Sequence, residues 1–585
     1  MTGARLVGWS VVFSFTLGIV LGGESATSAQ SALGLTHRGE PIAVHLAPEA
    51  ANLNHRGARL VIIGGHDGDP ASTGIVEQLR RDLNHVEAAA KHKSLVTFVP
   101  NAYPAGLAKG VADEEATRSY PPENGYYNDP HRPESRYLWR WTTQYGADLV
   151  IDIRTGKDAG FWMPKGLPTV DWLELILARD WKKLPQPAAD DFVVQLSSKG
   201  VSDTGITPAL ILQIPPASKE TAFKKINLLL QLAQTLDRSP ARRELIRREG
   251  LSAQDVSLRL SSTYGEDLFK LPIAPDKLTL DLMRNYPGVL GPWYEGWIDD
   301  ARRASEWGWS PNKLKKFYED KGIDTPKNQQ PDRDTELVRE LYFMALADRT
   351  GRNPGSSWND LLASFVEPAA DQFDGCETII NTARPLVRSG WLNARPQFTS
   401  AGLAHYRRVR NACRRDDGLF RHSPEVDVAW GRANGLAAMG LALILTDLPK
   451  DHPAMDELST DLAKHLSALL KHQDEFGHWR QVIDKPGSYA EFSATCLIAW
   501  TLRRGLEYDW LDVYTFQPAL ERAWRAVKRR ISEEGLIGDM CGALVKPKTL
   551  PDYLGSPARS GLDNQGGAIA ILLATELMAS GFGVK

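Results

Sequence analysis

The sequence predicts two domains of different classes, an α/β domain with a mainly parallel sheet and an all-α domain after it. Short aliphatic runs alternate with helical segments between about residues 59 and 216, as in strands joined by crossover helices. After about residue 300, long helical segments dominate. The composition, 24% charged residues with a net charge of -3, indicates a folded protein without a basic surface, so nucleic acid is not an expected partner.

The first 29 residues have the features of a secretory signal peptide. Arg5 precedes the apolar run "LVGWSVVFSFTLGIVLGG", and Thr27 and Ala29 supply the small residues of a cleavage site. We expect cleavage near Ala29 and a secreted or periplasmic protein. The alternative is that the same run stays as a membrane anchor; no later segment has enough apolar residues in sequence to cross a bilayer.

The first domain is expected over residues 30–240. Four aliphatic runs that end in turn residues are its predicted strands: "ARLVIIGGHDGD", "SLVTFVPNAYPAG", "ADLVIDIRTG" and "PALILQIPP". Three segments with helical spacing accompany them: "TGIVEQLRRDLNHVEAAAKH", "PESRYLWRWTTQYG" and "SKETAFKKINLLLQLAQTL". Functional side chains in such sheets lie at the carboxyl ends of the strands.

The segment "VIIGGHDGDPAST" (61–73) resembles the start of the zinc carboxypeptidase (M14) family and its succinylglutamate desuccinylase-like branch. In that family a His and, three residues on, a Glu bind zinc, and His66 and Asp69 hold these positions. Arg154 stands where the family has a third His ligand, and Gln213 where it has the general base. Arginine stays protonated and cannot coordinate zinc, and glutamine cannot take a proton from bound water.

These two replacements disfavour an active zinc peptidase. The alternative is that the domain is retained as a carbohydrate- or partner-binding module, with Arg154 and His66 lining the former catalytic cleft and no bound metal. The residues 241–325 that follow are rich in aromatics and prolines, and we expect them to form a linker or junction.

The second domain is expected over residues 326–585. Its predicted helices cover residues 335–349, 428–447, 455–472, 488–504, 514–532 and 564–580. Leu458, Leu462 and Leu466 recur every four residues, which is one buried stripe of a helix. Many helices joined by loops rich in aromatics and acids indicate a helical toroid with a cleft at one rim, although periodicity alone does not distinguish it from a solenoid.

The four cysteines, Cys376, Cys413, Cys496 and Cys541, all lie in the C-terminal half. In an exported protein they could pair in more than one way, and the sequence does not choose between these pairings. Cys496 lies in the apolar helical stretch "SATCLIAW", so we expect a buried free thiol there.

The stretch "GLFRHSPEVDVAWGRANGLAAMG" (418–440) places a His, two acids, a Trp and an Arg in front of a glycine-spaced helix. Together with 473–505 and 561–577 it resembles the unsaturated uronyl hydrolases, glycoside hydrolase families 88 and 105. The resemblance implies an (α/α)6 barrel without a metal or organic cofactor. Its substrate would be a lyase-cut oligosaccharide, from whose non-reducing end it releases a 4,5-unsaturated uronic acid.

In the chemistry that this resemblance implies, a carboxyl group protonates C4 of the enol ether, water adds at C5, and the resulting hemiketal opens. That carboxyl group must be protonated, and burial raises a carboxyl pKa in the required direction. Asp427 and Glu425 are the candidate proton donors, and Asp374, in "QFDGCETII", is the candidate second acid. From the residues alone, Asp427 could instead cap a helix, and Glu425 could be a solvated loop charge.

The resemblance also suggests six substrate-binding residues: His422, Trp430, Arg432, Trp479, Arg480 and Gln481. His422 would bind the uronate or orient the acid. The two tryptophans would stack on sugar faces, unless they are core aromatics. Arg432 would grip the sugar carboxylate with both arms of its guanidinium group, unless it forms an ion pair inside the barrel.

Two further features concern helix packing. Gly431, Gly435 and Gly440 would each be unfavourable in an isolated helix, so we expect them to allow close approach of a neighbouring helix. "SYAE" predicts a capping box from Ser488 to Glu491. A hypothesis of a different class makes both halves non-catalytic, as a secreted carbohydrate-binding or scaffold protein.

Overall fold

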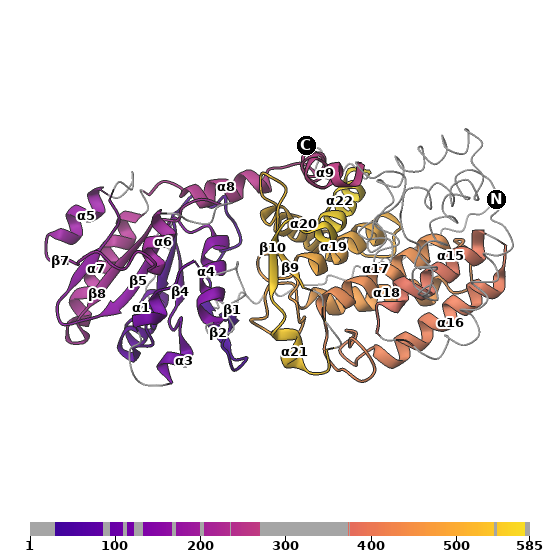
Figure 1. Ribbon diagram of the computed structural model, residues 1–585, viewed down its shortest axis with the longest axis horizontal. Coiled ribbons are helices and arrows are strands. Elements are labelled where there is room, and N and C mark those ends of the chain that lie inside the picture. The colour runs from indigo at the N-terminus through magenta and orange to yellow at the C-terminus, as the bar shows by residue number, and fades with distance from the viewer. Residues whose placement is uncertain are drawn as a thin grey trace, which may run out of the picture.

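The computed structural model describes residues 30–85, 94–108, 114–121, 133–165, 171–198, 204–233, 236–269, 373, 375–392, 394–542, 544 and 547–579. The predicted signal peptide, Asp374, the predicted helix at 335–349 and most of the predicted junction lie outside these residues. In Figure 1 the α/β domain and the helical domain lie side by side along the long axis of the molecule.

The α/β domain is built on one eight-stranded sheet in the order β1-β2-β4-β3-β5-β8-β6-β7. Its strands are β1 (Gln30–Leu35), β2 (Pro41–His45), β3 (Arg59–Ile63), β4 (Leu95–Val99), β5 (Leu149–Thr155), β6 (Gly160–Trp162), β7 (Lys182–Lys183) and β8 (Ala209–Ile214). The central strands β4, β3, β5 and β8 are parallel, and these are the four that the sequence predicts. They are buried on both faces, which is why they appear as continuous aliphatic runs.

Helices cover both faces of this sheet. Helices α1 (Pro70–His85), α5 (Asp171–Ala178) and α7 (Lys219–Leu232) pack on one face, and α4 (Pro133–Tyr145) and α6 (Phe192–Ser198) on the other. Short helices α3 (Pro104–Leu107), η1 (Glu114–Thr117) and η2 (Pro216–Ser218) lie in the connections. The predicted helices of this domain correspond to α1, α4 and α7.

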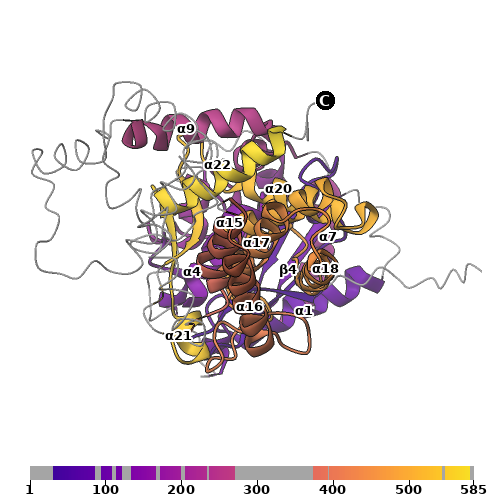
Figure 2. The ribbon, with the colours of Figure 1, turned by 90° about the vertical axis from the view of Figure 1, so that its right-hand side faces the viewer.

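The helical domain contains η5 (Ile379–Ala383), α15 (Arg384–Leu392), α16 (Pro396–Cys413), α17 (Gly431–Asp447), α18 (Met455–Leu470), α19 (Phe492–Glu507), α20 (Val513–Arg529) and α22 (Asn564–Ala579). Helix α17 is buried on all sides from Gly431 to Leu445, and α19 is buried over its first eleven residues, whereas α16, α18 and α20 each bury one face. This arrangement of inner and outer helices fits an (α/α)6 fold. Figure 2 shows α17 near the centre of the view, with α15, α16, α18 and α20 around it.

Small elements complete the second domain. The strands β9 (Ile537–Cys541) and β10 (Ala558–Gly561) form an antiparallel pair, and α21 (Leu550–Leu554) lies between them in sequence. Leu458, Leu462 and Leu466 of α18 are buried, as their spacing predicts.

Residues 240–269, which the sequence places in the junction, are helical. They form α8 (Pro240–Glu249) and α9 (Ala253–Phe269). Val256 and Leu260 of α9 are buried in the same core as α22, so α9 is part of the helical domain. The apolar spacing of Val256, Leu260 and Tyr264 is the helical signal that the assignment to a linker overlooked.

Glycines in α17 allow close helix approach, which confirms the expectation from their spacing. A Cβ added at Gly435 would lie 2.9 Å from Leu497 Cβ of α19, and one at Gly440 would lie 2.7 Å from Ile380 N. Real Cβ atoms almost never make such contacts, so the inner helices could not pack at this distance with alanine.

All four cysteines are buried and unpaired, which includes the free thiol expected at Cys496. Among the described residues, we find no helix with the length and apolar character needed to span a bilayer.

The two domains share a packed interface. Tyr489 and Ala558 of the helical domain belong to the core cluster that covers one face of the sheet. Arg529 Nη2 donates to the carbonyl oxygen of Ala51 at 2.8 Å, and Arg530 Nη1 donates to Gln144 Oε1 at 3.0 Å.

Candidate active site

The loop before α17 and the extended segment 478–482 meet at the N-terminus of that helix. Trp430 and Val482 form an isolated antiparallel bridge, and the N–H of Gly431 donates to the carbonyl oxygen of Gln481 at 2.7 Å. The backbone of His422 is fixed on two sides, because its N–H donates to Val428 and its carbonyl oxygen accepts from the N–H of Cys376, both at 2.8 Å. Three chain segments are thereby joined at one place.

Side chains of five residues gather there, and we call them the His422 cluster: Glu377, His422, Trp430, Gln481 and Tyr553. His422 Nε2 lies 3.3 Å from Glu377 Oε1, and His422 Nδ1 is hydrogen-bonded to the Tyr553 hydroxyl. The imidazole packs edge-on against Trp430 with 5.0 Å between ring centroids. Gln481 Nε2 donates to the carbonyl oxygen of Tyr553.

The direction of the hydrogen bonds in the cluster follows from the tyrosine. Burial and the nearby Glu377 carboxylate raise the pKa of Tyr553, so its hydroxyl keeps its proton and is able to donate to His422 Nδ1. In the tautomer whose Nδ1 accepts from Tyr553, the ring proton lies on Nε2, which is 3.3 Å from Glu377 Oε1. His422 is therefore held in one orientation with its donor directed at a carboxylate.

Three polar atoms of the His422 cluster have no hydrogen-bond partner in the described part of the chain: Glu377 Oε2, Trp430 Nε1 and Gln481 Oε1. All three are buried, and buried polar atoms in native proteins are nearly always paired. Two acceptors and one donor around one histidine are suited to a ligand that carries both hydroxyl and carboxyl groups.

The structure does not bring the two predicted proton donors to this cluster. Asp427 is 62% exposed, and its Oδ1 lies 3.8 Å from the Nε atoms of both Arg415 and Arg421. Glu425 is exposed and accepts a hydrogen bond from Ser423 Oγ at 3.0 Å. An exposed carboxylate between arginines lacks the apolar burial that keeps a carboxyl group protonated.

Asp427 is not a helix cap either. Helix α17 begins at Gly431, its N-cap position is Trp430, and no side chain caps it.

Two of the predicted substrate contacts are internal. Arg432 is buried, where its Nε donates to Ser493 Oγ at 2.9 Å and its guanidinium also binds the carbonyl oxygen of Cys541. Trp479 is 1% exposed, and its Nε1 donates to the carbonyl oxygen of Leu469 at 2.7 Å, so it belongs to the core. Both residues therefore have the alternative role given above, inside the domain and not in contact with a sugar.

Of the other predicted contacts, His422, Trp430 and Gln481 lie in the His422 cluster, whereas Arg480 faces the other domain. Sequence reasoning missed Glu377 and Tyr553. Glu377 could have been found, because it lies three residues after Asp374 in a stretch already singled out. Nothing around Tyr553 in the sequence indicates a role.

Glu491 is the N-cap of α19 and not the far partner of a capping box. It is fully buried, and its carboxylate accepts from the N–H groups of Ser493 at 3.1 Å, Ala494 at 2.6 Å and Cys541 at 2.9 Å. Ser488 Oγ instead donates to the carbonyl oxygen of Val482 at 3.0 Å.

The predicted vestigial metal residues of the α/β domain are engaged with other protein groups. His66 Nδ1 lies 3.2 Å from Asp152 Oδ2, while Asp69 accepts from the N–H of Ala71 at 2.9 Å at the start of α1. Gln213 Nε2 donates to the carbonyl oxygen of Asp158 at 3.0 Å. Within the described ranges, no three or more His, Cys, Asp or Glu side chains are grouped to hold a metal ion.

Arg154 is the centre of a buried ion-pair network in the α/β domain. It makes hydrogen bonds of 3.0 and 2.8 Å to Asp152 Oδ2, and of 2.9 and 3.1 Å to the two carboxylate oxygens of Asp191. Burial alone would raise the pKa of Asp152, but Arg154 and His66 hold that pKa at about 2. The guanidinium thus neutralises two carboxylates that are 0% and 3% exposed.

Comparison with known proteins shows a family similarity in the second domain. Residues 386–580 match the model of Glycosyl Hydrolase Family 88, which confirms the resemblance for this region and supports a glycosidase domain. The chain is 31% identical over 126 residues to "Unsaturated rhamnogalacturonyl hydrolase YesR" of Bacillus subtilis, which is 22% of this chain and 35% of the relative. The chain thus spans about a third of the length of this curated relative.

Two solved structures are also similar. A possible member of the GH105 family from Salmonella enterica has a TM-score of 0.44 and 18% identity, over 56% of this chain and 95% of that one. A metallo-carboxypeptidase from Burkholderia cenocepacia has a TM-score of 0.28 and 15% identity, over 35% of this chain and 65% of that one.

Proposed function

We propose that this protein is a glycoside hydrolase that releases 4,5-unsaturated uronic acid from the non-reducing end of lyase-cut oligosaccharides. The observation that carries the proposal is the family 88 match over residues 386–580. A relative that matches part of this region is named as an unsaturated rhamnogalacturonyl hydrolase, which favours an unsaturated uronide as substrate. The His422 cluster supports the proposal, because it combines a carboxylate, an oriented imidazole and an aromatic face.

The proposed reaction needs one proton donor and one activated water. A carboxylic acid protonates C4 of the enol ether, water adds at C5, and the hemiketal formed at C5 opens to release the neighbouring sugar. A general acid that transfers its proton in the transition state contributes about 100- to 10,000-fold in rate. Unlike ordinary glycosidases, this chemistry does not require a second carboxylate to displace the leaving group.

We assign the proton-transfer role to the segment 374–377. Asp374 is the acid that the resemblance suggests, and Glu377 is the carboxylate that accepts from His422 Nε2. The N–H of Cys376, next to Glu377, donates to the carbonyl oxygen of His422, so the backbone beside Glu377 is joined to the cluster as well. The exposure of Asp427 and Glu425 disfavours both as donors.

The other members of the cluster have binding roles in this proposal. Trp430 would offer its face to the unsaturated ring and its Nε1 to a sugar oxygen, and Gln481 Oε1 would accept from a hydroxyl group. Tyr553 would orient His422 without touching the substrate.

The test is an assay of the full-length protein on lyase digests of several uronate polysaccharides, followed by loss of the ultraviolet absorbance of the conjugated alkene. We expect at least one of the variants D374N and E377Q to lose ~100-fold or more in rate. D427N and E425Q should keep near wild-type activity. Retained activity in both D374N and E377Q would refute the assignment of the acid.

A non-catalytic carbohydrate-binding protein is the second candidate. The observation in its favour is that both acids of the stretch 418–440 are exposed and that Arg432 is committed to internal hydrogen bonds. If digests of all types keep their absorbance but bind the protein, this candidate replaces the hydrolase.

A further inference from the structure

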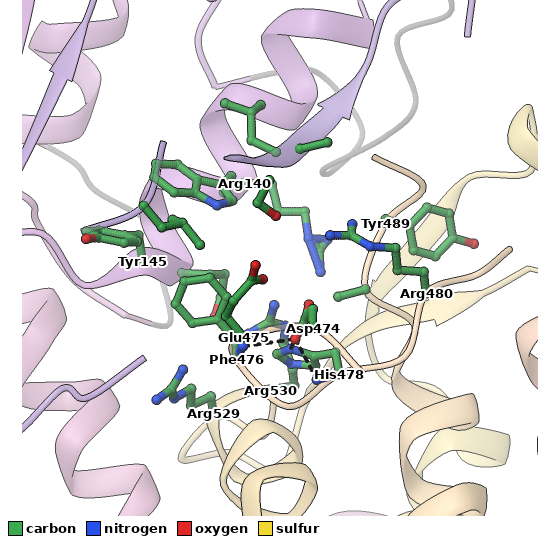
Figure 3. Close-up of a pocket in the computed structure, with 17 residues that line it drawn as sticks. Arg140, Tyr145, Asp474, Glu475, Phe476, His478, Arg480, Tyr489, Arg529 and Arg530 are labelled. Carbon is green, nitrogen blue, oxygen red and sulfur yellow. Dashed lines mark hydrogen bonds and ion pairs between the residues drawn. The ribbon is translucent and has the colours of Figure 1, made fainter. Parts of the chain in front are cut away.

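The two domains enclose a cavity of about 70 Å³ between them, away from the His422 cluster. Arg140, Gln144 and Tyr145 line it from the α/β domain, and Phe476, His478 and Arg480 line it from the helical domain. Figure 3 shows Arg140 and Tyr145 on one side of it, and Phe476, His478 and Arg480 on the other. One water requires about 10–15 Å³ of such space, so the cavity has room for a small organic molecule.

The cavity exists because the segment 478–482 is extended. Arg480 bridges Ala490, and Trp430 bridges Val482, so successive side chains point to opposite sides. Trp479 and Gln481 face the interior of the helical domain, where they bond to Leu469 and Tyr553. His478 and Arg480 face the α/β domain.

The charges that line the cavity leave one cation without a carboxylate. Arg140 and Arg530 both pair with Asp539, and Arg529 pairs with Glu249. Arg480 donates from Nη1 to the carbonyl oxygen of Ser488 at 2.9 Å, and it has no ion pair with any described carboxylate.

Two acidic residues also line the cavity. Asp474 accepts from the N–H groups of Phe476 and His478, at 3.0 and 2.8 Å. Glu475 lines it too, but its side chain is exposed to solvent. Neither forms an ion pair with Arg480, although the charge of Arg480 contributes to the lowered pKa of Asp474. The guanidinium nitrogens of Arg480 that do not bind Ser488 are suited to an anionic oxygen.

His478 is the second observation that indicates a ligand. It is 3% exposed, its Nδ1 lies 3.6 Å from Asp474 Oδ1, and its buried Nε2 has no hydrogen-bond partner among the described residues. Burial and the nearby Arg530 lower the pKa of His478 to about 4, so the ring is neutral near pH 7. With the ring proton on Nδ1 toward Asp474, Nε2 accepts a hydrogen bond, as from a hydroxyl group.

We propose that this interdomain cavity binds a hydroxylated carboxylate, with the carboxylate on Arg480 and a hydroxyl group on His478 Nε2. An acidic monosaccharide has this chemistry, both as a free molecule and as a uronate residue of a longer saccharide. The site is separate from the His422 cluster and does not depend on the reaction proposed there.

The experiment is isothermal titration calorimetry on the full-length protein with D-glucuronate, D-glucose, sulfate and a saturated uronate trisaccharide. We expect glucuronate to bind, glucose not to bind, and sulfate to bind more weakly because it has no hydroxyl group at neutral pH. The R480Q variant should bind glucuronate about 10- to 100-fold more weakly, which is the usual effect of losing a charged hydrogen bond. The R480K variant keeps the positive charge but not the planar guanidinium group. Its affinity for glucuronate should lie between those of the wild-type protein and R480Q.

The matched control is R247Q, which removes the same charge from an exposed pair with Glu244 and should leave binding unchanged. E377Q should also bind glucuronate normally, which separates this site from the His422 cluster. Binding of the trisaccharide would identify a residue within a chain as the ligand, and binding of the monomer alone would identify the free acid.

Three results would overturn the proposal. These are no glucuronate binding to the wild-type protein at millimolar concentration, sulfate binding as tight as glucuronate binding, and loss of binding in E377Q but not in R480Q. Thermal melts of each variant would show whether R480Q is folded. If R480Q is not folded, the glucuronate affinity of R480K is compared with that of the wild-type protein instead.

Discussion

Removing the guanidinium of Arg154 should destabilise the α/β domain by an amount that the structure sets. Arg154 bridges Asp152 and Asp191, which are 0% and 3% exposed, so R154Q leaves two buried carboxylates without their cation. Breaking a buried pair from one side costs about 3–5 kcal/mol. Because 19% of Arg154 is exposed, we expect the lower end, ~3 kcal/mol. For a domain of this size that corresponds to roughly 6–12 °C in melting temperature.

The pH dependence distinguishes this explanation from loss of packing. Burial would raise the pKa of Asp152, but in the wild-type protein Arg154 and His66 lower it to about 2, below its ordinary 3.8. The pair therefore stabilises the fold fully above about pH 4, and this contribution is lost as the pH falls toward 2. In R154Q only His66 opposes the effect of burial, so the pKa of Asp152 is higher than in the wild-type protein and the variant regains relative stability as the pH falls. The difference between the two proteins should shrink between pH 7 and pH 4.

Thermal unfolding followed by circular dichroism at pH 7 and pH 4 is the assay. The control is K182Q, which breaks an ion pair with Asp158 whose side chains are 76% and 66% exposed, and which should cost no more than ~1 kcal/mol. A melting temperature of R154Q equal to that of K182Q at pH 7, or a difference from wild type that does not change with pH, would refute the reasoning.

Three further predictions concern the helical domain and the N-terminus. G440A should cost about 1–3 kcal/mol in urea unfolding because the added Cβ overlaps neighbouring backbone, whereas G74A in α1, where a Cβ meets nothing within 4 Å, should be neutral or stabilising. E491A should destabilise more than D512A in the same measurement, since Glu491 is buried with three N–H donors while Asp512 is an exposed cap worth ~1 kcal/mol; equal losses would contradict this. Edman sequencing of exported protein should begin just after Ala29, and an intact N-terminus in a membrane fraction would favour the anchor instead.

Most helices and strands could be predicted from the sequence, because the apolar pattern that marks each of them lies within the element itself. The aliphatic runs at 59–63 and 149–153 become central strands, since a parallel strand is buried on both faces and shows it in every residue. The four-residue spacing in α18 and the glycine spacing in α17 likewise depend only on helix geometry.

Site residues were harder to predict, because tertiary neighbours decide what a side chain does. Arg432 looked available for a sugar carboxylate, but its partners Ser493 and Cys541 lie 61 and 109 residues further along the chain. Asp427 had the sequence context of a cap and of an acid, but Arg415 and Arg421 surround it on the surface. Such long-range pairs leave no periodic trace in the sequence.

The extended segment 478–482 connects the His422 cluster with the interdomain cavity. Its alternate side chains serve two places, with Gln481 in the His422 cluster and Arg480 in the interdomain cavity. The backbone of this segment is fixed by two bridges, from Arg480 to Ala490 and from Val482 to Trp430. A ligand held by Arg480 would thus bind one residue away from Gln481, in a cavity whose other side is formed by Arg140, Gln144 and Tyr145 of the α/β domain.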